Sequence, residues 1–213
     1  MGRTLNLKNL YAKKFSTFAF TGIWKTVMGL PETCGIWIIY GIEKNGKTWF
    51  CLMLAEYLSQ FARVLYVSAE EGMGKDFVAA VKRAKLDPEN NALQFSEYLT
   101  VTELEDKLTK RNAPKVVFID NITVFQEELK YGKLRKLKDA FPKVLFVYVA
   151  HEDENKKGAP YTATAKLAKK LAKVIVHVQG LACFVSGRVP GGVMSINEEK
   201  AMLYHGMQEL NND

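Results

Sequence analysis

From Gly35 onward, the chain alternates short apolar runs with amphipathic stretches. Five runs are rich in β-branched or aromatic residues and contain no charged residue, which predicts buried strands at residues 36–40, 64–68, 116–119, 144–150 and 174–178. The stretches between them predict helices at residues 47–61, 74–85, 101–111, 131–141 and 162–173. This order is typical of an α/β fold in which a mainly parallel sheet is flanked by helices.

The two ends of the chain depart from this alternation. Residues 182–185 and 193–196 flank a turn at 187–192, which predicts a C-terminal β-hairpin, and residues 201–205 predict an additional strand. The first 34 residues mix basic and aromatic side chains, and Pro31 interrupts them shortly before the first clear strand. We therefore expect an irregular or partly helical lead-in at residues 1–34 and one core domain at residues 35–213.

Composition and charge narrow the class of protein. The cysteines Cys34, Cys51 and Cys183 are odd in number and lie in apolar stretches, which favours reduced thiols and a cytoplasmic location. No apolar run approaches the roughly 20 residues that a membrane span requires, so no membrane partner is expected. The net charge of +7 favours a polyanionic partner, because basic surfaces release counterions from nucleic acid.

The segment YGIEKNGKTWF follows the first predicted strand and leads into an apolar helix. In a phosphate-binding loop, glycines let backbone N–H groups converge on phosphate oxygens, a lysine reaches the β and γ phosphates, and a hydroxyl binds magnesium. A strand before the loop and a helix after it complete this context, since the helix N-terminus attracts anions. The predicted nucleotide-binding residues in this segment are Gly41, Asn45, Gly46, Lys47, Thr48 and Trp49.

A second nucleotide-site feature is a carboxylate at the end of a later buried strand. Asp120 follows the run KVVFI and can hold magnesium together with Thr48. The expected cofactors are therefore ATP and Mg²⁺, with Thr48 and Asp120 as the metal-binding residues. A strand-ending aspartate is common, so this feature gains its meaning from the loop that precedes it.

The segment RVLYVSAEE places Glu70 and Glu71 at the end of the strand that follows the loop helix. Here the chain resembles RecA-fold P-loop ATPases, in particular the group of RadA and the DnaB-like helicase cores. The resemblance implies that Glu70 activates the attacking water, with Glu71 as the alternative. Capping of the following helix is the other reading of these carboxylates.

The resemblance continues to about residue 192. The run VLFVYVAH is similar to the family's sensor strand, which lies between the loop strand and the Asp120 strand and places His151 near the γ phosphate. The following segment, EDENKKGAPYTATAKLAKK, is similar to the family's mobile DNA-contacting loop and the helix after it. Lysines at helical spacing here predict a basic face, for which ordinary solvation is the alternative. The candidate nucleic-acid-binding residues are Lys156, Lys157, Lys166, Lys169, Lys170 and Lys173.

The segment VSGRVPGG is similar to the family's lysine-asparagine-arginine-phenylalanine-glycine segment, in which the arginine reaches the nucleotide of a neighbouring subunit. The resemblance gives this catalytic role to Arg188 and implies a ring or filament of identical chains. Ser186 stands where the family has lysine, which departs from the pattern. Compact cores of this kind also resemble those encoded by phages or mobile elements.

These features predict an ATPase that couples ATP hydrolysis to single-stranded DNA binding or movement in replication or recombination, with an accessory replication protein as a further partner. The alternative is a nucleotide-gated interaction module with little turnover. A nucleotide kinase is less well supported, because arginines are few and scattered. A GTPase is disfavoured, because the NKKG segment at Asn155 lacks the aspartate that guanine recognition requires. The predicted catalytic residues are Lys47, Glu70, His151 and Arg188.

Overall fold

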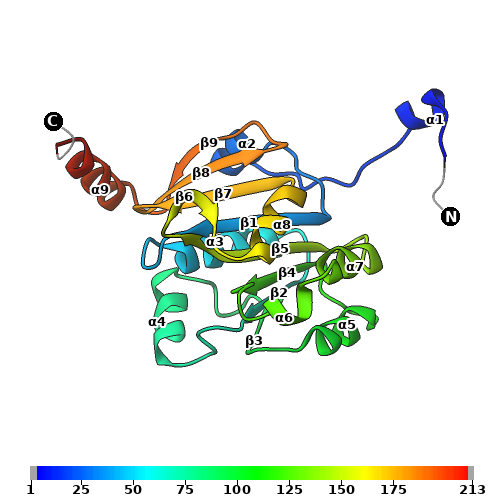
Figure 1. Cartoon of the computed structure of the whole chain (residues 1–213), viewed down its shortest axis with the longest axis horizontal. Helices are drawn as coiled ribbons and strands as arrows, with labels where there is room; N and C mark the ends of the chain where they lie inside the picture. The colour runs from blue at the N-terminus through cyan, green and yellow to red at the C-terminus, as the bar shows by residue number, and fades with distance from the viewer. Residues whose placement is uncertain (1–3, 211–213) are drawn as a thin grey trace.

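The computed structural model describes residues 4–210, with side chains described as far as residue 205. Within these residues, the strands form a nine-stranded sheet in the order β3-β2-β4-β5-β1-β7-β8-β9, with β6 paired to β5 (Figure 1). The strands are β1 (Gly35–Gly41), β2 (Val64–Ser68), β3 (Leu93–Ser96), β4 (Val116–Asp120), β5 (Leu145–Asp153), β6 (Lys156–Pro160), β7 (Val174–Gln179), β8 (Ala182–Gly187) and β9 (Gly192–Ser195).

The sheet is parallel from β3 through to β7. The last two strands, β8 and β9, continue it as antiparallel neighbours, which confirms the predicted C-terminal hairpin. All five strands expected from the apolar runs are present, and β5 lies between β1 and β4 as the resemblance implied. Because the strands are parallel, the carboxyl ends of β1, β2, β4 and β5 meet at one edge of the sheet.

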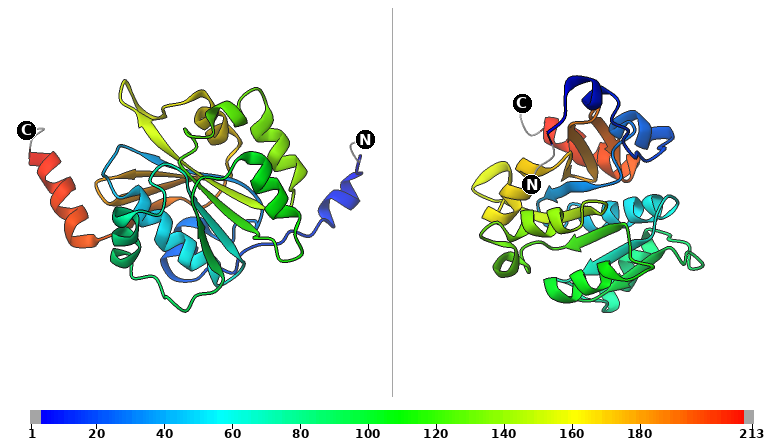
Figure 2. Two further views of the ribbon diagram at one scale, coloured as in Figure 1. Left: turned by 90° about the horizontal axis from the view of Figure 1, so that it is seen from below. Right: turned by 90° about the vertical axis from the view of Figure 1, so that its right-hand side faces the viewer.

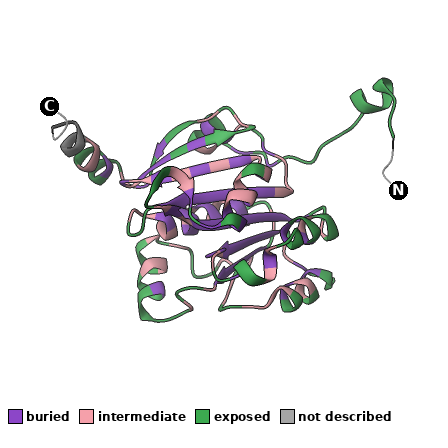
Figure 3. Ribbon diagram, viewed as in Figure 1, coloured by how far each residue is buried: buried purple, intermediate pink, exposed green. Residues whose placement is uncertain are grey.

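Helices cover both faces of the parallel part of the sheet (Figure 2). One face packs against α2 (Gly22–Met28), α3 (Lys47–Ser59) and α4 (Lys75–Arg83). The other face packs against α5 (Val101–Thr109), α6 (Gln126–Leu129), α7 (Lys133–Ala140) and α8 (Ala163–Leu171). Because both faces are covered, the central strands are apolar throughout and buried along most of their length (Figure 3).

The lead-in is only partly separate from the sheet. Phe18 and Phe20 are buried and contact the ring of Trp37 on β1, and Trp24 stacks on Tyr57 of α3. Residues 4–17, which include α1 (Leu7–Tyr11), are exposed, and α1 extends away from the sheet in Figure 1. The aromatic residues of the lead-in therefore complete the core on the α3 face, whereas the first part of the chain does not.

The predicted strand at residues 201–205 is wrong. These residues belong to α9 (Glu198–Leu210), and the Asn197 side chain accepts a hydrogen bond from the Lys200 N–H at its start, 3.0 Å away. Glu198 and Glu199 occupy the first turn, where acidic residues favour the helix dipole. A capping asparagine followed by acidic residues and good helix formers outweighs the short apolar run.

Other local details follow the sequence more closely. Thr100 caps α5 through a reciprocal capping box with Glu103, as its position before the helix predicted. The short strands β3 and β6 and the short helix α6 were not predicted, because each has too few residues to establish a period. Among the residues that the structure describes, no helix is long and apolar enough to cross a membrane.

Candidate functional site

The predicted phosphate-binding loop joins β1 to α3 at the carboxyl edge of the sheet. Gly46 is the N-terminal cap of α3 and has a φ of 98°, a conformation that favours glycine. A Cβ atom at Gly41 would lie 2.1 Å from the carbonyl oxygen of Val178 on β7. One at Gly46 would lie 2.5 Å from Cδ2 of Leu181. Both motif glycines are thus required by close packing as well as by loop shape.

A cavity of about 630 Å³ opens at this edge of the sheet. It brings together residues from the loop, from the ends of β2, β4 and β5, and from α4 and α9. The predicted residues that line it are Gly46, Lys47, Thr48, Trp49, Glu70, Glu71, Asp120 and His151, and those not predicted include Glu43, Asp76, Arg83, Asn121, Leu181 and Lys200. The strand order therefore gathers side chains that are far apart in the sequence.

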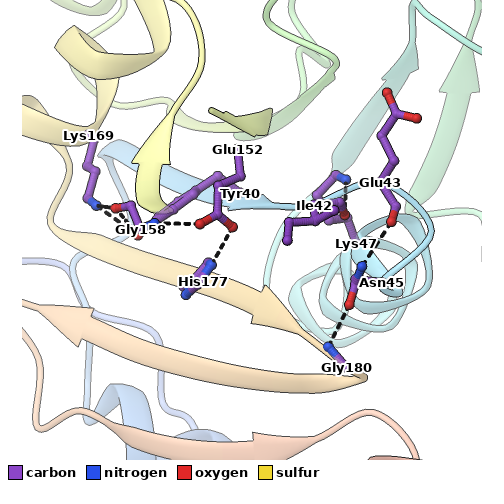
Figure 4. A network of polar contacts seen from close by, with 10 residues as sticks. All are labelled: Tyr40, Ile42, Glu43, Asn45, Lys47, Glu152, Gly158, Lys169, His177 and Gly180. Atoms are coloured by element: carbon purple, nitrogen blue, oxygen red, sulfur yellow. Dashed lines mark hydrogen bonds and ion pairs between the residues drawn. The ribbon is translucent and has the colours of Figure 1, made fainter. Parts of the chain in front are cut away.

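Lys47 is folded back onto its own loop. Its Nζ donates a hydrogen bond to the carbonyl oxygen of Ile42, 2.8 Å away, and the residue is only 8% exposed (Figure 4). Burial lowers the pKa of Lys47, and the nearby carboxylates of Asp120, Glu43 and Glu70 oppose that shift. A buried ammonium with a single carbonyl partner has donors left for an anion, as phosphate binding requires.

The side chain of Asn45 is used within the protein. Its Oδ1 accepts a hydrogen bond from the Gly180 N–H at 2.8 Å, and its Nδ2 donates to the carbonyl oxygen of Glu43 at 2.9 Å (Figure 4). Asn45 thereby ties the loop to the turn between β7 and β8. We expected this residue to bind nucleotide, and its backbone N–H is the group still suited to do so.

Asp120 and Thr48 form the donor set expected for a metal ion. Both line the cavity beside Lys47, and a carboxylate with a hydroxyl provides the hard oxygen ligands that Mg²⁺ prefers. The residues present therefore fit Mg²⁺. Burial raises the pKa of Asp120 to about 6, opposed by a hydrogen bond from Tyr66 and supported by the charges of Glu71 and Glu70.

Glu70 is held by two neighbours, one of which was predicted. His151 Nε2 lies 3.1 Å from both carboxylate oxygens of Glu70, and Asn121 Nδ2 donates to Oε2 at 3.0 Å. Among the described residues, the side chain of Glu71 makes no hydrogen bond, so the structure distinguishes the two carboxylates by their contacts. Asn121 is 1% exposed. Its position directly after Asp120 is the signal that could have identified it.

Arg188 lies away from the cavity of its own chain. β8 runs antiparallel to β7 and pairs Gly187 with Val174, at the amino end of β7. The Arg188 N–H donates to the carbonyl oxygen of Lys173 there, 2.7 Å away. Since the loop lies at the carboxyl edge, Arg188 is at the opposite end of the parallel strands. A role for this arginine in a nucleotide site would therefore require a second chain.

The predicted basic face of α8 is divided in the structure. Lys166 lies 3.2 Å from Asp153, and Lys173 lies 2.7 Å from Glu32. Lys169 donates to both Tyr40 Oη and the carbonyl oxygen of Gly158 at 2.7 Å (Figure 4). Three of the four lysines thus have intramolecular partners. The candidates that remain exposed are Lys170 on α8 together with Lys156 and Lys157 on β6.

Comparison with known proteins supports the fold. No protein-family model matches the chain, and no curated protein matches its sequence. The solved ATPase domain of a phage DnaB-like helicase is similar to this chain with a TM-score of 0.57 at 13% sequence identity, covering 79% of this chain and 83% of that one. At this identity the likeness concerns the fold, and the chain therefore has the fold of a RecA-like P-loop ATPase domain, with the predicted loop at its carboxyl edge.

Proposed function

We propose that the protein binds ATP with Mg²⁺ and hydrolyses it. The observation that carries this proposal is the meeting of Lys47, Thr48, Asp120 and the Glu70–His151 pair in one cavity. Each group has a distinct role in phosphoryl transfer to water, and only the fold brings them together. When bound, Mg²⁺ would neutralise charge on the phosphates, held by Thr48 and Asp120.

The protein's own groups supply the other roles. Lys47 exchanges the carbonyl oxygen of Ile42 for phosphate oxygens when nucleotide enters. Glu70 orients the attacking water, and His151, which contacts both oxygens of Glu70, keeps that carboxylate in place. A γ phosphate near His151 would compete for this contact, so nucleotide binding is expected to alter the Glu70–His151 pair.

We further propose that hydrolysis is coupled to single-stranded DNA in replication or recombination, within a ring or filament of identical chains. The exposed lysines Lys156, Lys157 and Lys170 and the net charge of +7 support a nucleic-acid partner. The position of Arg188 outside its own cavity supports a site completed by a neighbouring chain. An accessory replication protein remains a further proposed partner.

The test is ATP hydrolysis by the wild type and by Glu70→Gln, with and without single-stranded DNA, at several protein concentrations. DNA-stimulated turnover that is lost in Glu70→Gln is the expected result. Glu71→Gln is the matched control, because it removes a neighbouring carboxylate that lacks the His151 contact. Equal loss in both variants would contradict the role given to Glu70.

A nucleotide-gated interaction module is the second candidate. It is favoured by the contacts of the free protein, in which both oxygens of Glu70 and the ammonium of Lys47 already have partners. Such a site can bind ATP and change its contacts without rapid turnover. ATP binding with no hydrolysis under every condition of the same experiment would replace the ATPase with this function.

A further inference from the structure

A buried tyrosine lies behind the proposed metal ligand. Tyr66 is on β2, next to β4, and its hydroxyl donates to Oδ2 of Asp120 at 2.5 Å. The residue is fully buried, and its ring stacks on Phe118 with a centroid separation of 5.4 Å. Phe77 and Phe95 contact the same ring, each with a centroid separation of 5.8 Å. Three aromatic neighbours therefore fix the ring, and its hydroxyl has one direction available.

This contact separates the two oxygens of Asp120. Oδ2 accepts the hydroxyl of Tyr66, whereas Oδ1 has no hydrogen-bond partner among the described residues. Asp120 lines the cavity, so the carboxylate is held from behind and remains available to a ligand in front. A hydrogen bond to an ionised acceptor is short and strong, and it favours the charged form that a metal ion requires.

A second buried tyrosine shows what a purely structural ring looks like in this fold. Tyr148 is fully buried on β5, and its hydroxyl has no hydrogen-bond partner among the described residues. Its ring fills the opposite core layer, where it stacks near Phe146. The comparison shows that this sheet can bury a tyrosine for its ring alone. The hydroxyl of Tyr66, by contrast, is directed at a residue of the candidate site.

We propose that Tyr66 is a positioning residue that orients Asp120 for Mg²⁺ and keeps one of its oxygens free for that ion. This inference rests on the proposed function, since it concerns the same nucleotide site. Tyr66 does not touch nucleotide or metal, because it is buried beneath Asp120. Its contribution should therefore be visible in metal binding and absent from the nucleotide contacts made by Lys47.

The test compares Tyr66→Phe with Tyr148→Phe, which makes the same chemical change on a hydroxyl without a partner among the described residues. Binding of a fluorescent ATP analogue is titrated with Mg²⁺, and Mn²⁺ binding is followed by electron paramagnetic resonance. Tyr66→Phe should raise the half-saturating metal concentration about tenfold, as expected for one charge-assisted hydrogen bond. Binding of the analogue in EDTA should be unchanged, and Tyr148→Phe should match the wild type in both measurements.

Asp120→Asn provides the second control. Tyr66→Phe should have no further effect on the metal requirement in the Asp120→Asn background, because the two residues act through one contact. An additive effect, or a metal requirement in Tyr66→Phe equal to that of the wild type, would overturn the inference while leaving the proposed function standing. Failure of the wild type to bind the analogue with or without metal would instead overturn both.

The wild type offers a second measurement if Tyr66→Phe does not fold. A tyrosine hydroxyl proton shared with a buried carboxylate exchanges slowly and is visible by nuclear magnetic resonance. The proton of Tyr66 should shift when Mg²⁺ and nucleotide are added together, and shift less with nucleotide alone. The same shift in both cases would contradict the positioning role.

Discussion

Nε2 of His177 lies 2.7 Å from Oε2 of Glu152, which ties β7 to the end of β5 (Figure 4). Glu152 is 7% exposed, and its second oxygen accepts the Gly158 N–H at 2.5 Å. The carbonyl oxygen of Gly158 is in turn bound by Tyr40 and Lys169. Both polar groups of Gly158 in the β5–β6 hairpin are therefore held by the body of the domain.

This arrangement leads to a prediction for Glu152→Gln. The amide removes a buried charge from His177, so the hairpin should lose about 1–3 kcal/mol of local stability. Hydrogen exchange of residues 154–160 should become at least about tenfold faster. Glu154→Gln is the matched control, since Glu154 is an exposed carboxylate of the same hairpin. Equal exchange in the two variants would show that the Glu152 contact does not hold the hairpin.

The pKa of Asp120 predicts how metal-dependent binding responds to pH. Because burial raises this pKa to about 6, Mg²⁺-dependent nucleotide binding should weaken as pH falls through 6. The folded pKa lies above the ordinary value of 3.8, so ionisation of Asp120 disfavours the folded state. The free energy of unfolding should therefore decrease, relative to Asp120→Asn, as pH rises from about 4 to about 6. Chemical denaturation across this range provides the measurement, and a parallel pH dependence in both proteins would contradict the assignment.

The distance of Arg188 from its own cavity predicts complementation between two inactive variants. Arg188→Ala should lower turnover by about 10³, as removal of an arginine finger does in related P-loop systems. Lys47→Ala should abolish hydrolysis, because the lysine serves the phosphates. Mixing the two should restore part of the activity, since a Lys47→Ala chain can still supply Arg188 to its neighbour. The readout is turnover against mixing ratio, and Arg135→Ala on the exposed side of α7 is the control for an arginine outside the site.

The division of the α8 lysines predicts which cations contact DNA. The double change of Lys156 and Lys157 to alanine should weaken single-stranded DNA binding and reduce its salt dependence by about one to two counterions. Lys169→Ala should instead act through the hairpin, because that lysine is bound to Tyr40 and Gly158. Fluorescence anisotropy against salt concentration separates these effects. A larger change in salt slope for Lys169→Ala would return the contact to α8.

Local sequence patterns were sufficient for the sheet and for the loop. The five apolar runs became central strands because a strand buried on both faces must be apolar at every position. The spacing of Gly41, Gly46 and Lys47 predicted a strand-to-helix loop, since few other residues tolerate these conformations and close approaches. Residues 201–205 show where such patterns fail, because a short apolar run is compatible with a strand or a helix.

The tertiary structure decided the partners of the polar side chains. The sequence contains Lys166, Lys169 and Lys173 at helical spacing, but acids and carbonyl groups from distant segments determine that they are not a free surface. It also contains Tyr66 as one apolar residue of a strand, and only the neighbouring β4 shows that its hydroxyl meets Asp120. Periodicity along a chain reports which face of an element is buried, whereas a hydrogen bond depends on which elements lie side by side. The sequence by itself therefore determined the class of fold and the phosphate-binding loop, and strand order decided the rest of the candidate site.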